Sequence, residues 1–343
     1  MVRLIDVARA AGVSPMTVSR VLRDAPDISV KTKARIRTLV KEMGYVPDVL
    51  AQGLRTRLTK LFGVILPSLN DPIFARIAAG LEDSLREMGY DVLLAQSLAQ
   101  PEGEERCIRH MLARRVEGLF LVPVNRLASA ALIYQELEKR GAKVVILGPR
   151  APFCERFTNV ECDDAHASAA ATQHLIGLGH RRIAFLAGSP ASPAARHRME
   201  GYRRAHRQAQ IPVDDHLIFS AGGTIEDGAK AALQLLHEST QYTAIQAAND
   251  LIAIGAANTL LNQGVRIPQD LSVVGFGNIL TSEFFRVPLT TVRQPKYRLA
   301  QIAVEAMLRL KRGQGPETRR MPAELVIRSS TAPPRNLEPS GAS

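Results

Sequence analysis

Two groups of residues carry the side-chain types that metal binding or acid–base catalysis requires. Cys107 and His110 have a C-x-x-H spacing, but no second pair stands at matching spacing to complete a zinc site. Asp163, Asp164 and His166 stand at an expected strand-to-helix junction, where acids favour capping of the next helix. Nucleophile-elbow, H-E-x-x-H, phosphate-loop and dinucleotide patterns do not occur in the sequence. We therefore expect no enzyme, no metal and no cofactor.

A different chemistry, hydrogen bonding to DNA, is indicated near the N-terminus. The fork of Arg20 can bond guanine N7 and O6, and Met16 can pack on a thymine methyl group. Short hydroxyl side chains beside them can reach phosphates. The residues that we expect to contact DNA here are Ser14, Pro15, Met16, Thr17, Ser19 and Arg20.

Three short helices are predicted to position these side chains: Leu4–Ala11, Pro15–Leu22 and Val30–Met43. Ser14 is a good N-cap for the second helix and Pro15 suits its first position. A tight glycine turn between the first two helices fits a helix-turn-helix, whose second helix enters the major groove. The spacing alone leaves a small helical appendage with a solvated basic face as an open alternative.

The charge distribution favours a polyanionic partner. The chain of 343 residues has a formal net charge of +11. Residues 1–60 hold 12 of the 44 Lys and Arg but only 5 of the 33 Asp and Glu. A basic module on a nearly balanced body indicates nucleic acid or an anionic membrane surface, although a solvated face gives the same count.

Composition indicates a soluble globular protein of more than one domain, with 46% hydrophobic and 22% charged residues. No apolar run approaches the ~18 residues of a membrane helix. The first residues include Asp6 where a signal peptide is apolar, and three cysteines are too few for a disulfide framework. We expect a cytoplasmic protein that has no membrane partner.

Beyond the basic module, apolar runs alternate with helical patterns, which is typical of doubly wound parallel sheets. The runs expected as strands are Leu61–Leu66, Asp91–Gln96, Gly118–Val122, Val144–Leu147, Ile183–Ala187, Ala244–Ala247 and Ser272–Phe276, with late strands near Leu289–Arg293 and Glu324–Arg328. Helical patterns include Ile73–Met88, Glu104–Arg115, Ala165–Leu178, Ala195–Gln208 and Leu251–Gln263. These strand–helix units are too numerous for one sheet of ordinary size. We therefore predict two lobes, with the late strands crossing between them.

The sequence resembles the lactose-repressor and purine-repressor family of bacterial transcription factors nearly from end to end. The segments that carry the resemblance are Ile5–Leu22, Gly44–Pro47, Leu50–Arg55, Asn249–Asp250, Leu271–Phe276 and Pro288–Val292. It implies an all-α helix-turn-helix headpiece followed by an α/β, two-lobe, periplasmic-binding-protein-like effector domain. The expected parts are a headpiece (1–46), a hinge helix and linker (47–60), an N-terminal lobe (61–161 with 290–322), a C-terminal lobe (162–289 with 323–331) and a mobile tail (332–343).

The resemblance implies a hinge helix that folds on DNA and wedges a leucine into the minor groove. Leu54 matches that leucine, and Arg55 beside it can meet phosphates. Asp48 and Gly53 depart from the family pattern. Because glycine costs a helix roughly 1 kcal/mol, this hinge is expected to depend more strongly on DNA for folding.

The resemblance also implies a small effector bound between the lobes. The effector residues carried over or adjacent to a matched motif are Ile73, Phe74, Arg198, Asn249, Asn278 and Gln294. Sugar-binding members usually have an aspartate where Gly277 stands. Losing that carboxylate while keeping Arg198 lowers the penalty on an anion, so the sequence favours a sugar acid over a neutral sugar. Asp250 is expected to cap a helix.

We expect a sequence-specific regulator of transcription that acts as a repressor. It is expected to bind a palindromic operator as a homodimer. The segment after Arg328 carries Pro333, Pro334 and Pro339 instead of a leucine heptad, which favours a dimer over a tetramer. A solute-binding protein and a sugar-processing enzyme are the alternatives. The basic headpiece disfavours the first of these, and the lack of catalytic motifs disfavours the second.

Overall fold

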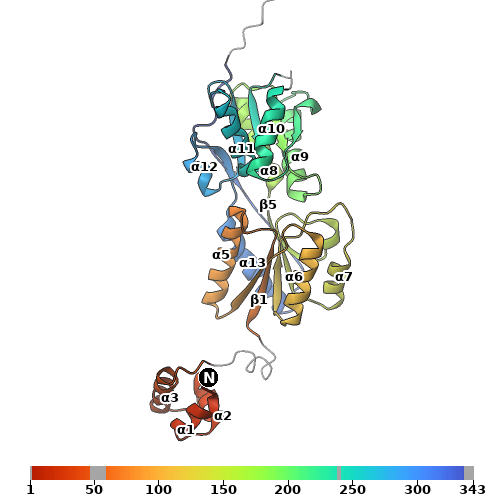
Figure 1. The fold of residues 1–343 in the computed structure, drawn as a ribbon. Coiled ribbons are helices and arrows are strands. Elements are labelled where there is room, and N and C mark those ends of the chain that lie inside the picture. The colour runs from red at the N-terminus through yellow and green to blue at the C-terminus, as the bar shows by residue number, and fades with distance from the viewer. Residues whose placement is uncertain (1, 47–58, 238–240, 336–343) are drawn as a thin grey trace, which may run out of the picture. The chain divides into compact units, whose positions relative to one another are not determined.

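The computed structural model describes residues 2–46, 59–237 and 241–335. The chain divides into two compact units, one before Lys60 and one from Lys60 onward (Figure 1). Each unit has its own hydrophobic core. The units therefore fold around separate sets of apolar side chains, as the change in sequence pattern predicts.

The first unit consists of three helices: α1 (Leu4–Ala10), α2 (Pro15–Leu22) and α3 (Val30–Glu42). Gly12, with φ +63°, makes the turn between α1 and α2. Val18 and Val21 are fully buried in the core of this unit, and Leu22 is partly buried against it. The guanidinium of Arg35 on α3 donates to the carbonyl of Ala11 at 2.9 Å, which ties the third helix to the first.

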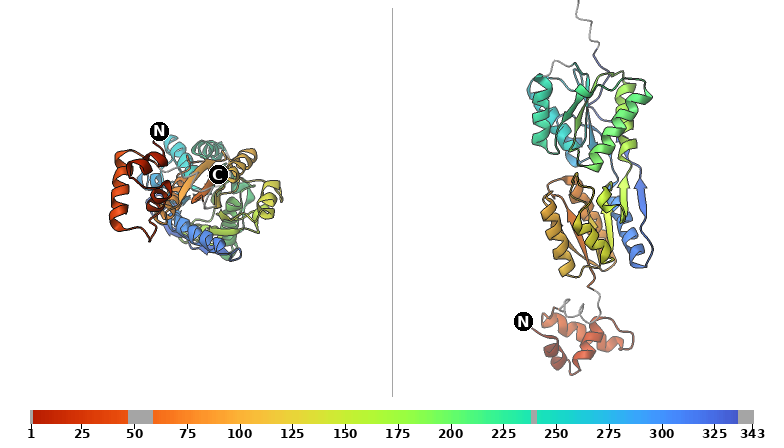
Figure 2. Two further views of the ribbon diagram at one scale, coloured as in Figure 1. Left: turned by 90° about the horizontal axis from the view of Figure 1, so that it is seen from below. Right: turned by 90° about the vertical axis from the view of Figure 1, so that its right-hand side faces the viewer.

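The second unit contains two six-stranded sheets, each covered by helices (Figure 2). The first sheet has the order β11-β5-β4-β3-β1-β2. Its strands are β1 (Leu61–Leu66), β2 (Asp91–Gln96), β3 (Gly118–Leu121), β4 (Val144–Leu147), β5 (Thr158–Cys162) and β11 (Thr318–Met321). The helices of this lobe are α5 (Pro72–Glu87), α6 (Pro101–Ala113), α7 (Leu132–Lys139) and α13 (Lys296–Lys311). We call it the N-terminal lobe.

The second sheet has the order β12-β10-β9-β8-β6-β7 and forms the C-terminal lobe. Its strands are β6 (Ile183–Ala187), β7 (Ile218–Ser220), β8 (Ala244–Ala247), β9 (Ser272–Gly277), β10 (Thr290–Arg293) and β12 (Glu324–Val326). Its helices are α8 (Asp164–Gly177), α9 (Pro193–Gln208), α10 (Ile225–His237), α11 (Asp250–Asn262) and α12 (Leu280–Phe284). All neighbouring strands in both sheets are parallel except β10 and β12. The predicted two-lobe, doubly wound architecture is confirmed.

The chain crosses between the lobes three times, after β5, after β10 and after β11. Strand β10 pairs with β9 and β12, so residues 290–293 belong to the C-terminal lobe and not, as predicted, to the N-terminal one. The crossing therefore lies after Arg293, where α13 begins and packs on the N-terminal sheet. The sequence reading also missed β5, β7 and β11.

The segment that follows β12 is held against the C-terminal lobe rather than mobile from residue 332. The backbone N–H of Ala332 donates to the Ser272 hydroxyl at 3.0 Å, and its carbonyl accepts from Nε2 of His180 at 2.9 Å. Ser330 is 1% exposed and donates to the carbonyl of Val273. Arg335, the last described residue, also pairs with Asp270 at 3.5 Å, and residues 336–343 lie outside the described ranges.

Acidification is expected to loosen this C-terminal segment. Burial lowers the pKa of His180 below its ordinary value of 6.5, so the proton binds preferentially once the imidazole is exposed. The stabilisation that neutral His180 gives to the docked segment is complete above about pH 6.5. It is lost as the pH falls through the lowered pKa of His180. Hydrogen exchange of residues 328–335, corrected for intrinsic rates, should accelerate between pH 7 and pH 5.

The matched control is His206→Asn, because His206 is also buried with a lowered pKa but bonds the carbonyl of Tyr202 instead. Its exchange profile in residues 328–335 should follow the wild type. His180→Asn should expose the segment at every pH. A wild-type profile that does not change with pH contradicts the assignment.

Candidate functional site

The predicted DNA-contacting residues lie on α2 and its cap. The Ser14 hydroxyl accepts from the N–H of Thr17 at 3.1 Å and lies 2.9 Å from the Thr17 hydroxyl, so both side chains also stabilise the helix start. Pro15 occupies the first helical position, and Ser19 is half-buried. The structure therefore confirms the predicted cap and gives Ser14 and Thr17 a structural role besides any contact with phosphate.

Met16 and Arg20 project from the exposed surface of α2. Met16 is 57% exposed, so its side chain is accessible to a partner. The guanidinium of Arg20 forms an ion pair with the carboxylate of Asp27, in the turn that leads to α3. Leu54 and Arg55, the predicted hinge contacts, lie outside the described residues.

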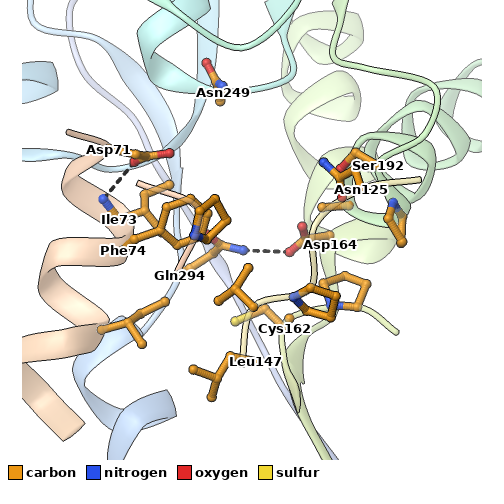
Figure 3. Close-up of a pocket in the computed structure, with 18 of the residues that line it drawn as sticks. Asp71, Ile73, Phe74, Asn125, Leu147, Cys162, Asp164, Ser192, Asn249 and Gln294 are labelled. Atoms are coloured by element: carbon orange, nitrogen blue, oxygen red, sulfur yellow. Dashed lines mark hydrogen bonds between the residues drawn. The ribbon is translucent and has the colours of Figure 1, made fainter. Parts of the chain in front are cut away.

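A cavity of about 230 Å³ lies between the two lobes of the second unit (Figure 3). Side chains from the N-terminal sheet, from α5, α8, α9 and α13, from the N-cap of α11 and from two crossings line it. Of the predicted effector residues, the cavity lining includes Ile73, Phe74, Arg198, Asn249 and Gln294. These five were drawn from segments far apart in the sequence, and the fold brings them together.

One wall of the cavity is apolar and rests on the start of α5. Asp71 caps this helix, because its carboxylate accepts from the N–H of Ile73 at 2.9 Å. This cap and the following Pro72 fix the first turn, which presents Ile73 and Phe74 to the cavity (Figure 3). Both side chains also pack against the core of the N-terminal lobe. Phe153 adds a second aromatic ring to the lining.

The polar floor of the cavity is built on a buried ion pair. Arg198 donates through Nε to the carboxylate of Asp164 at 2.9 Å and through a second guanidinium nitrogen to the carbonyl of Ala248 at 2.6 Å. Gln294 donates to the other carboxylate oxygen of Asp164 at 2.8 Å (Figure 3). The Arg198 and Asp164 side chains are 13% and 1% exposed. Most N–H donors of the Arg198 guanidinium are thus used by Asp164 and Ala248.

Asn249, and not Asp250, is the N-cap of α11, and Asn249 also lines the cavity. Asn249 caps α11, because its side-chain oxygen accepts from the N–H of Ile252 at 2.7 Å. Its amide nitrogen donates to the carbonyl of Gly223. Asp250 is instead 1% exposed and accepts from the hydroxyls of Ser282 and Thr291, and burial raises the pKa of its carboxyl. The prediction that Asp250 is the cap is wrong.

Asn278 does not line the cavity. Its backbone turns at φ +48°, and its side-chain oxygen accepts from Arg328 at 2.8 Å. The side chain is therefore tied to the strand region behind β10. The sequence reading placed Asn278 in the site by its position next to Gly277, but a single positive-φ residue redirects the side chain away.

Three charged residues of the lining were not predicted as effector contacts: Asp71, Asp164 and Lys296. Burial raises the pKa of Asp71 and lowers that of Lys296. The ammonium of Lys296, which opens α13 at the second crossing, donates to the carbonyl of Gly277 at the end of β9. With Asp164 and Arg198, the lining holds two carboxylates and two cations, so its formal charge is zero.

A buried carboxylate holds a second part of the cavity lining, the segment that follows β3. Glu104, on α6, is completely buried, and burial raises its pKa. It accepts from the N–H of Val124 at 2.6 Å and from the hydroxyl of Tyr134 at 2.9 Å, and it pairs with Arg126. These bonds anchor the irregular segment after β3, which contributes Val124 and Asn125 to the cavity.

Within the described part of the chain, no helix is long and apolar enough to cross a membrane. The same residues contain no group of three or more His, Cys, Asp or Glu side chains arranged to hold a metal ion.

Breaking the pair on the cavity floor is expected to destabilise the second unit. Asp164→Asn leaves a buried guanidinium without its carboxylate, which costs about 3–5 kcal/mol. Arg198→Met alone strands Asp164, whereas the double variant removes both charges. Urea unfolding should show that the double variant is more stable than the sum of the single effects by at least about 1 kcal/mol. Strictly additive effects contradict a direct pairing.

Comparisons with known proteins agree with this geometry. Residues 3–48 match the family described as bacterial regulatory proteins, lacI family, and residues 172–331 match a periplasmic binding protein-like domain. The HTH-type transcriptional repressor CytR of Escherichia coli (strain K12) is 34% identical over 328 residues, which are 95% of each chain.

Two solved structures of transcriptional regulators are similar to this chain over nearly its whole length. A lac repressor dimer bound to operator and an anti-inducer matches 96% of this chain and 99% of its own, with TM-score 0.86 and 29% identity. A complex of the transcriptional regulator CelR with cellobiose matches 96% of this chain and all of its own, with TM-score 0.73 and 29% identity. The relatives are transcriptional regulators and not enzymes, and this chain belongs to the lacI family of bacterial regulatory proteins.

Proposed function

We propose that this DNA-binding regulator represses transcription as a homodimer on a palindromic operator, and that a small neutral sugar-like ligand in the interlobe cavity sets its operator affinity. A cytoplasmic location follows from its DNA partner. The observation that carries the ligand class is the Asp164–Arg198 pair, because it leaves the cavity without net charge.

The DNA contacts are assigned to the exposed surface of α2. Arg20 offers N–H donors to guanine, and Met16 offers an apolar contact to a thymine methyl group. Ser14, Thr17 and Ser19 contact phosphates, with Pro15 fixing the start of the helix. Leu54 as a minor-groove wedge and Arg55 as a phosphate contact remain predictions from the family resemblance.

Dimerisation is supported by operator symmetry and by exposed apolar side chains. A helix-turn-helix protein reads two half-sites by placing two copies about a twofold axis. Leu280 and Phe284, both on α12, are each 75% exposed, and exposed apolar side chains of this size favour an interface. The lac repressor matched above is described as a dimer on its operator.

The ligand class follows from charge and shape. The sequence favours a sugar acid because Gly277 stands where sugar-binding members usually have an aspartate, but in the fold Asp164 pairs with Arg198. A ligand anion gains little from a guanidinium that already bonds Asp164 and Ala248. Phe74 and Phe153 suit an apolar ring face, while Asp71 and Asn125 suit hydroxyl groups. CelR, similar in fold, is described with cellobiose, a neutral sugar.

Operator binding is expected to require an inverted repeat. Duplexes enriched from a random library should contain two half-sites, and Arg20→Ala and Leu54→Ala should each weaken binding on the order of tenfold or more. The logarithm of the affinity should fall with the logarithm of salt concentration, by about 0.9 per neutralised phosphate. Fluorescence anisotropy measures both. Equal affinity for the enriched site and a scrambled duplex rejects the proposed function.

Ligand selectivity is expected to follow the charge of the cavity. Calorimetry with D-ribose, D-glucose and cellobiose, against D-gluconate and D-glucuronate, should detect heat only from neutral compounds. Asp164→Asn frees the guanidinium of Arg198, so this variant should bind the acids better than the wild type does. Binding of acids alone by the wild type contradicts the neutral class and restores the prediction made from the sequence.

A further inference from the structure

The turn between α2 and α3 contains two acidic residues that have different partners. Asp24 accepts from Arg37 at 2.8 Å and pairs with Lys33 at 3.0 Å, so it ties the turn to α3. Asp27 instead pairs with Arg20, on the outward surface of α2. An acid on a unit that binds DNA opposes the phosphate field, so the position of Asp27 requires a reason.

Fold stability does not supply that reason. The Arg20 and Asp27 side chains are 44% and 49% exposed, and an ion pair so exposed contributes between zero and about 1 kcal/mol. The pair does restrict the guanidinium. Arginine carries five N–H donors in a rigid fork, and a carboxylate that engages one terminal nitrogen leaves the other edge for an acceptor. That edge has the geometry needed for guanine N7 and O6.

The carboxylate also acts on unspecific binding. A guanidinium that is free to rotate can bond any nearby phosphate, which raises the affinity for every sequence equally. Asp27 competes with phosphate for Arg20 and adds a negative charge beside the backbone. Specificity often depends on such a repulsive element as well as on an attractive contact.

We propose that Asp27 is a specificity-determining positioning residue of the DNA-binding surface, which orients the Arg20 fork toward one base pair per half-site and holds it away from phosphates. The proposal rests on the assignment of Arg20 as a base-reading residue.

The test compares Asp27→Asn with Asp24→Asn, because each variant removes one negative charge from the same turn. Two probes are used: a 30-base-pair duplex of random sequence, and the inverted repeat enriched by the wild-type full chain with all single base-pair replacements. Arg20→Ala identifies the base pair that Arg20 reads, as the position where this variant loses its preference.

Both Asn variants should bind the random duplex several-fold more tightly because each removes one negative charge, and Asp27→Asn should gain more because it also releases Arg20 to phosphates. Only Asp27→Asn should flatten the preference at the Arg20 base pair, on the order of tenfold. Asp27→Glu keeps a carboxylate and should recover part of that preference. Circular dichroism of each variant confirms that the helices are formed.

Equal base preferences in Asp27→Asn and Asp24→Asn overturn the proposal, because Asp27 then acts by charge alone. If Arg20→Ala keeps the full base preference of the wild type, the assignment of Arg20 fails and the proposal fails with it. Loss of preference in Arg20→Ala together with an intact preference in Asp27→Asn rejects only the role of Asp27.

Discussion

A buried carboxylate and a buried guanidinium meet where the chain first leaves one sheet for the other, and the cavity depends on that contact. Asp164 opens α8 directly after β5, and Arg198 reaches it from α9. Neither charge is stable in the interior without the other. Gln294, at the second crossing, completes the group by donating to Asp164. The polar floor of the cavity and the junction of the lobes are thus the same set of side chains.

This coincidence provides a physical basis for regulation. The crossings place Cys162, Asp164, Gln294 and Lys296 in the cavity lining, and a bound ligand touches the segments that must bend when the lobes move. A ligand that prefers one lobe arrangement shifts the population toward it. If that arrangement also alters operator affinity, then ligand and operator change each other's affinity by the same factor.

The sequence predicted the elements that a local apolar pattern marks. It missed those whose residues can be interpreted only from distant contacts. The strands β1, β2, β4, β6 and β8 have the predicted bounds, because continuous apolar runs are sufficient to mark them. Strand β5 reads as polar, yet it is wholly buried. Its Asn159 donates to the carbonyl of Gly148 and its Glu161 pairs with Arg320 on β11. Only the folded chain brings those partners near.

The same distinction applies to the site. Five of the residues that the family motifs indicated line the cavity, because motif order preserves backbone position. They could not show that Asp164 neutralises Arg198 across 34 residues of sequence, nor that Asn278 turns toward Arg328. Charge balance, and with it the class of ligand, is a property of tertiary contacts. Asp71 and Lys296 carried no signal in the sequence beyond their proximity to matched motifs.

Gly277 limits how the ligand specificity of this regulator can change through evolution. Its φ of +136° is rarely adopted by other residues, and an added Cβ would lie 3.1 Å from Cδ1 of Ile73 and 3.4 Å from a carboxylate oxygen of Asp250. An aspartate there would meet strain, crowding and a like charge at once. Gly277→Asp alone is therefore expected to be strained in this fold. A change in specificity must first remodel the neighbours of Gly277 or alter recognition at another wall.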